Sequence, residues 1–130
     1  MNGGGQVALE LERLDLNGGA YYVDVGLYER GWAYAGASTG LDEAGHLDIP
    51  AMVAALGRLA ATGAAAAELA THPGAHDDPD RVRYRWAYQW DDEYVALRSA
   101  TVRAAVDELG FRLGTFAELP APGPPAEADR

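Results

Sequence analysis

The stretch Arg81-Val82-Arg83-Tyr84-Arg85-Trp86-Ala87-Tyr88-Gln89-Trp90 decides the predicted fold. Large apolar side chains occupy every second position of it, namely Val82, Tyr84, Trp86, Tyr88 and Trp90. A period of two residues is typical of a β-strand with one buried face. Three of the intervening positions are Arg81, Arg83 and Arg85. The stretch therefore predicts a strand with an aromatic face and a cationic face.

The residues before this stretch predict an antiparallel meander of three strands. Apolar and polar residues alternate over Val7 to Leu11, and the residues of Ala20 to Glu29 divide between two faces in the same period of two. Trp32 to Ser38 consists mainly of small and aromatic residues and is predicted as the third strand. Asn17-Gly18-Gly19 and Arg30-Gly31 separate these segments, and glycine and asparagine accept the backbone angles that tight turns require. The strand at 81–90 is then the fourth of the sheet.

Two helices are predicted by a change of period. After Asp48, a good N-cap, and Pro50, apolar residues recur at steps of three and four as far as Ala60. Gly63 ends this helix, or the alanines at 64–67 extend it to Ala70. The second helix begins with Asp91, Asp92 and Glu93, buries a face lined by Val95, Val102, Val106 and Leu109, and ends at Gly110.

Together these segments predict an α+β domain in the order β-β-β-α-β-α, with an antiparallel sheet packed against two helices. We expect one domain over residues 1–118, with residues 1–5 flexible. Residues 119–130 contain four prolines, which predicts a disordered or extended tail. Many unrelated folds share this order of elements, so it carries no function by itself.

Composition excludes several classes of protein. The chain has 130 residues, a formal charge of -10 and no cysteine, so neither disulfides nor a thiol nucleophile is available. Strong acidity opposes the binding of nucleic acid, which needs a basic surface to displace counterions. No apolar run reaches the length of a membrane span, and residues 1–6 lack the features of a signal peptide. We expect a cytoplasmic protein.

The negative charge is concentrated in residues 1–80, which hold 12 acids and 3 arginines. Such asymmetry favours a non-enzymatic protein that binds a basic protein partner, because complementary charge accelerates association and selects partners. Immunity proteins, inhibitors, adaptors and chaperones act in this way, and a homodimer is compatible with it. No cofactor is expected. The predicted contacts are Asp24, Glu29, Asp42, Glu43, Asp77, Asp78 and Asp80.

A metal-dependent enzyme is the first alternative. The segment from His72 to Asp80 combines two histidines with three aspartates, and imidazole and carboxylate oxygens are common metal ligands. The candidate ligands are His72, His76 and Asp77. Pro73-Gly74 opposes a helix that would place both imidazoles on one face, so a polar connecting loop is the simpler explanation of the segment.

A small-molecule binding protein is the second alternative. Trp32, Tyr34, Trp86, Tyr88 and Trp90 would line an aromatic pocket if they share a face of the sheet. The same rings would also serve as the core of a domain that has few large aliphatic residues. For the arginines of the strand we expect acidic neighbours as counter-charges, or a bound phosphate or carboxylate group.

Overall fold

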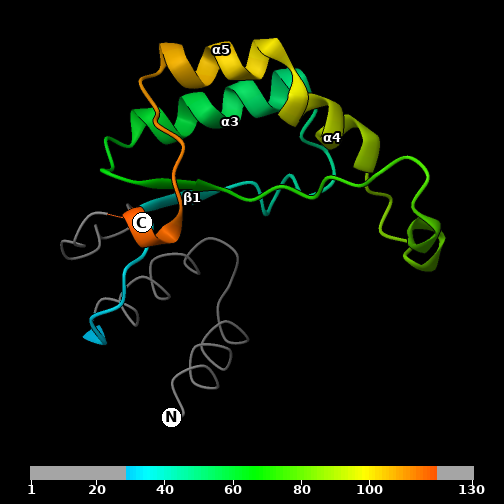
Figure 1. The fold of residues 1–130 in the computed structure, drawn as a ribbon, viewed down its shortest axis with the longest axis horizontal. Coiled ribbons are helices and arrows are strands. Elements are labelled where there is room, and N and C mark those ends of the chain that lie inside the picture. The colour runs from blue at the N-terminus through cyan, green and yellow to red at the C-terminus, as the bar shows by residue number, and fades with distance from the viewer. Residues whose placement is uncertain (1–28, 120–130) are drawn as a thin grey trace. The chain divides into compact units, whose positions relative to one another are not determined.

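The computed structural model describes residues 29–119. In chain order they form β1 (Ala37–Thr39), α3 (Ile49–Ala61), β2 (Ala67–Leu69), the 3₁₀ helix η1 (Pro79–Arg83), α4 (Trp90–Arg98), α5 (Ala100–Glu108) and the 3₁₀ helix η2 (Phe116–Glu118) (Figure 1). The strand predicted at 7–11 lies outside the described residues, as does all but the last residue of the strand predicted at 20–29. The single domain expected over residues 1–118 stays a prediction.

The chain divides into two compact units. One comprises residues 37–64 and 68–113 and contains α3, α4 and α5. The other comprises residues 1–36, 65–67 and 114–130, of which the structure describes 29–36, 65–67 and 114–119. The stretch from His72 to Trp90 lies in the helical unit.

The predicted sheet is wrong. In the described residues β1 and β2 form a two-stranded sheet, and its strands are parallel. The strand expected over 32–38 is reduced to β1, and residues 81–90 contain no strand. The reason is the connection: β1 and β2 are joined through α3, and a helical crossover returns the chain in the same direction, whereas an antiparallel meander needs tight hairpins.

Helix α3 begins and ends where local chemistry predicts. The Asp48 carboxylate accepts a hydrogen bond from the Ala51 amide at 3.0 Å, and Pro50 occupies the first turn. Gly63 follows the helix with φ +67, a left-handed conformation that costs glycine little. The alternative extension of the helix to Ala70 is wrong, because Ala67–Leu69 forms β2.

The second predicted helix is split into α4 and α5 at Ser99. Its first turn does carry Asp91, Asp92 and Glu93. Gly110 has φ +80, and the Phe111 amide donates to the Val106 carbonyl at 2.9 Å, which is the expected C-terminal cap. The break changes which side chains face inward, so Val95 is exposed whereas Val102 is buried.

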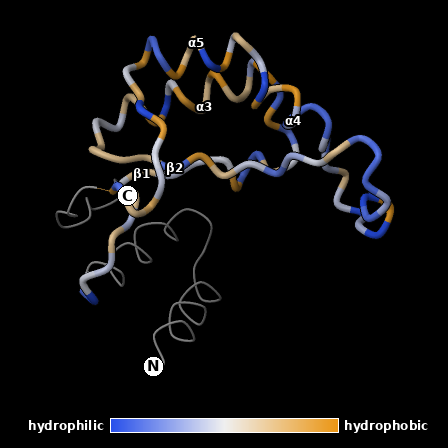
Figure 2. The backbone as a smooth tube through the Cα atoms, viewed as in Figure 1, coloured by the Kyte–Doolittle hydropathy of each residue, from blue (hydrophilic) through white to orange (hydrophobic). Residues whose placement is uncertain are grey.

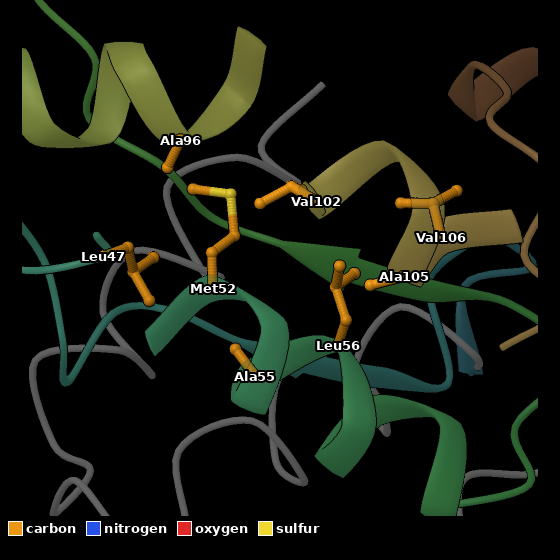
Figure 3. Packing of buried hydrophobic residues seen from close by; sticks show 8 residues of the cluster. All are labelled: Leu47, Met52, Ala55, Leu56, Ala96, Val102, Ala105 and Val106. Carbon is orange, nitrogen blue, oxygen red and sulfur yellow. The ribbon is translucent and has the colours of Figure 1, made fainter. Parts of the chain in front are cut away.

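The core of the helical unit lies between these helices. Helix α3 packs against both α4 and α5 (Figure 1), and each helix carries hydrophobic as well as hydrophilic stretches (Figure 2). The Met52 side chain extends from α3 toward Ala96 and Val102 (Figure 3). The cluster consists of Leu47, Met52, Ala55, Leu56, Ala96, Val102, Ala105 and Val106.

Candidate functional site

The predicted aromatic strand is divided among three parts: residues 81–83 end η1, residues 84–89 form an irregular connection, and Trp90 begins α4. The 3₁₀ helix η1 begins after Asp78, whose carboxylate accepts from the Asp80 amide at 2.9 Å, and Pro79 is its first residue. Ala87 has φ +56, which interrupts an extended backbone. Figure 1 shows η1 beyond the N-terminal end of α4, at the right of the view.

The four aromatic residues that alternate in this stretch nevertheless lie together in the structure, with their rings in contact. We call Tyr84, Trp86, Tyr88 and Trp90 the aromatic cluster. Ring centroids are 4.6 Å apart for Tyr84 and Trp86, and 5.0 Å apart for Tyr88 and Trp90. Trp86 contacts Tyr88 and Trp90 at 5.5 and 6.1 Å. The rings pack on one another, and two stay open to solvent: Tyr84 is 49% and Trp86 is 56% exposed.

Two glycines hold the inner half of the cluster. Tyr88 lies directly against Gly45, where a Cβ atom would come within 2.3 Å of the tyrosine ring, and Gly45 also has φ +79. Trp90 lies against Gly74 in the same way, with a closest approach of 2.9 Å. The Gln89 amide donates to the Gly45 carbonyl at 2.7 Å, and the Gly74 amide to the Trp90 carbonyl at 3.2 Å. Because Gly45 and Gly74 have no side chains, Tyr88 and Trp90 can lie directly against the backbone, and these contacts fix the positions of the two rings.

An ion pair between Arg81 and Asp91 closes the loop that carries η1. The two guanidinium nitrogens donate to the two carboxylate oxygens at 3.0 and 2.9 Å. Arg81 also donates to the carbonyls of Ala75 and His76. This hydrogen-bonded pairing lowers the pKa of Asp91 below its ordinary value and raises that of Arg81.

The remaining arginines of the segment differ in their partners. Arg83 forms an ion pair with Asp80 at 3.1 Å, which confirms that acidic neighbours balance part of the cationic stripe. Arg85 is exposed, and within residues 29–119 it makes no ion pair or hydrogen bond. The guanidinium group of Arg85 is therefore free for a partner, as far as residues 29–119 show.

Glu93 is a structural residue that the sequence reading did not single out. Its side chain is fully buried, and its carboxylate accepts from the amides of Leu47 and His72. These amides belong to the segments before α3 and after β2, so Glu93 ties both to α4. The only available signal was its place as the last of the three acids in the first turn of α4.

The candidate metal ligands are not assembled into a site. The His72 ring contacts the Tyr88 ring edge-on at 5.4 Å, whereas His76 faces Asp91 at 3.4 Å. Asp77 is exposed. Within residues 29–119, no group of three or more histidine or acidic side chains is placed to hold a metal ion. In the described part of the chain, the buried His72 Nδ1 atom has no hydrogen-bond partner.

The five residues predicted to line an aromatic pocket do not all belong to the same unit. Trp86, Tyr88 and Trp90 come together in the aromatic cluster, whereas Trp32 and Tyr34 belong to the other unit. Trp32 is exposed and Tyr34 is buried. The cluster is not the core that the sequence offered as an alternative, since the core of the helical unit is built from aliphatic residues.

The predicted acidic contacts fall into two groups. Glu43, Asp78 and Asp80 are engaged within the chain, through an ion pair with Arg58, a helix cap and an ion pair with Arg83. Within residues 29–119, no hydrogen bond or ion pair involves Glu29, Asp42 or Asp77. Asp24 lies outside the described residues.

Comparison with protein-family models, with curated proteins and with solved structures finds no significant match to this chain. Across residues 29–119, none of the helices has the length and apolar character needed to cross a membrane.

Proposed function

We propose that the chain is a non-enzymatic cytoplasmic protein that binds a basic protein partner through carboxylates on its surface. The supporting observation is that, within residues 29–119, arginines and acids differ in how many of them have a partner inside the chain. Every arginine there except Arg85 makes an internal interaction, whereas several acids make none. These acids are Glu29, Asp42, Glu68, Asp77, Asp92 and Glu108.

Carboxylates without internal partners favour a cationic partner for a physical reason. An acid already paired must lose that pair before it binds elsewhere, whereas an exposed unpaired acid is ready to do so. Complementary charge of this kind also accelerates the encounter, and salt weakens it. The proposal thus needs neither a cofactor nor a reaction, and an immunity protein, inhibitor or adaptor would fit it.

Panning a phage-displayed library of random peptides on the full chain at physiological salt tests the proposal. We expect the enriched peptides to carry net positive charge and to bind the Asp42→Asn, Asp77→Asn double variant less tightly. The matched control is Glu43→Gln, Asp80→Asn, which removes the same charge from acids already paired. Enrichment of neutral or acidic peptides would contradict the proposal, as would equal weakening by the two double variants.

A further inference from the structure

The two-stranded sheet leaves an edge of β2 without a neighbouring strand. The Ala66 carbonyl and the Ala70 amide, at the two ends of β2, bond to backbone groups in and next to β1 at 3.1 and 2.9 Å. Because backbone groups alternate between the two sides of a strand, those of Ala67 and Leu69 face away from β1. In the part of the chain that the structure describes, no third strand lies on that side.

An open strand edge is a binding surface for an extended peptide. Its outward N–H and C=O groups form a template on which a further strand is added to the sheet. Hydrogen bonds between the two backbones then provide affinity, and the side chains along the edge provide specificity. The residues of β2 therefore determine which peptide the edge accepts.

The side chains of β2 favour a basic segment. Glu68 is exposed and makes no ion pair or hydrogen bond among the described residues, whereas Leu69 packs against the core cluster. In an added strand, the residue opposite Glu68 shares its exposed face, and opposite charges at such positions stabilise strand pairing. The two neighbours of that residue lie on the face of Leu69, where apolar side chains extend the core. The matching segment has the pattern apolar–basic–apolar.

The charge of Glu68 also decides between a partner protein and this chain itself. Antiparallel pairing of β2 with β2 of a second copy, in register, would place Glu68 opposite Glu68, and like charges at that position are destabilising. Within residues 29–119, the segment that alternates arginine with apolar residues is 81–85. Its first three residues belong to η1, where Arg81 and Arg83 are paired with aspartates. A separate basic protein is therefore the favoured occupant.

We propose that the basic partner adds an extended segment to the outer edge of β2, with a lysine or arginine opposite Glu68. This inference rests on the proposed function and specifies the segment of the partner that binds. The added strand is antiparallel, because antiparallel pairs are slightly more stable per residue than parallel ones. The basic residue then turns its own amide away from β2, and its two apolar neighbours form hydrogen bonds with Ala67 and Leu69.

Titration of the full chain with the end-blocked peptide Thr-Val-Arg-Val-Thr, followed by amide NMR, tests the proposal. In the free chain we expect the Leu69 amide to exchange with solvent faster than the Ala70 amide, which donates to the Thr39 carbonyl. The peptide should slow exchange at Leu69. Methylating a valine amide of the peptide should weaken binding about tenfold, because a hydrogen bond to β2 is lost. Methylating the arginine amide should have no effect.

A substitution in the chain tests the ion pair. Glu68→Gln should weaken binding of the peptide about two- to fivefold, because an opposite-charge pair between strands is lost. Glu108→Gln is the matched control, since it makes the same change at an exposed acid on α5 that is unpaired within residues 29–119. Glu68→Lys should bind Thr-Val-Glu-Val-Thr more tightly than the arginine peptide.

Several results would overturn the inference. They are the absence of binding, equal weakening by Glu68→Gln and Glu108→Gln, and equal effects of the two methylated peptides. A stronger effect of methylation at arginine would overturn the antiparallel direction. Binding that leaves the Leu69 amide unprotected would place the peptide elsewhere, so that this inference fails while a basic partner is still supported. Enrichment of neutral or acidic peptides in panning would instead remove the proposed function, whatever the titration gives.

Discussion

Gly45 shows how one residue without a side chain sets the position of the aromatic cluster. We expect Gly45→Ala to destabilise the chain by about 2–4 kcal/mol, because a left-handed alanine costs about 1 kcal/mol and the clash with Tyr88 adds about 1–3. Gly63→Ala is the matched control: its φ is also positive, at +67, yet a Cβ there meets no atom within 4 Å. It should cost only the backbone part, about 1 kcal/mol. Chemical denaturation measures both, and equal losses would contradict the contact with Tyr88.

Glu93 makes a second prediction at the scale of one residue. Replacing the carboxylate by an amide turns one acceptor into an NH₂ group that faces a backbone N–H, and an unsatisfied buried donor costs about 1–3 kcal/mol. We therefore expect Glu93→Gln to lower the free energy of unfolding by that amount. The same change at Glu108, which is exposed and unpaired among the described residues, should be neutral. A neutral Glu93→Gln would show that the two amides do not depend on the carboxylate.

The break between α4 and α5 depends on the side chain of Ser99. Its hydroxyl accepts from the Val102 amide at 3.1 Å and donates to the Ala96 carbonyl at 2.9 Å, so it serves both helix ends. Ser99→Ala should cost about 1 kcal/mol, as losses of N-caps do. Urea denaturation measures this cost, with Thr101→Ala inside α5 as the control. A gain in stability and in helical circular dichroism would instead show that the two helices had fused.

The elements that failed to match expectation share one cause. The alternation at 81–90 predicts which side chains share one side of the segment. For the rings of the aromatic cluster this prediction is correct, because they contact one another. A strand also needs a neighbour for its backbone groups. Here the Gln89 amide and the Trp90 carbonyl bond to Gly45 and Gly74, which are loop residues. Helix α3, whose hydrogen bonds are local, was predicted well because it needs no distant partner.

At the scale of the whole molecule, the pair of Arg81 and Asp91 should make stability depend on acid. The folded pKa of Asp91 lies below its usual value of 3.8, chiefly because Arg81 donates to its carboxylate. The stabilisation is therefore complete above the unfolded pKa and is lost as the pH falls below about 3.8. We expect the difference in Tm between wild type and Asp91→Asn to be largest at neutral pH and to shrink below that point.

Arg81→Gln removes the same pair from the other side and provides the control for this prediction. Its difference in Tm from wild type should decline over the same range of pH. A difference that stays constant as the pH falls well below 3.8 would show that Asp91 stabilises the loop by its shape and not by its charge.

The sequence alone determined the features that depend on neighbouring residues. It placed the start of α3 at Asp48, the acidic first turn of α4, the cap at Gly110 and the grouping of the aromatic rings. Only the tertiary structure decided that β1 and β2 are parallel, that Glu93 is buried, and that Tyr84 and Trp86 remain open. The physical reason is range: caps and periodicity act within a few residues, whereas strand pairing and burial join segments distant in the chain.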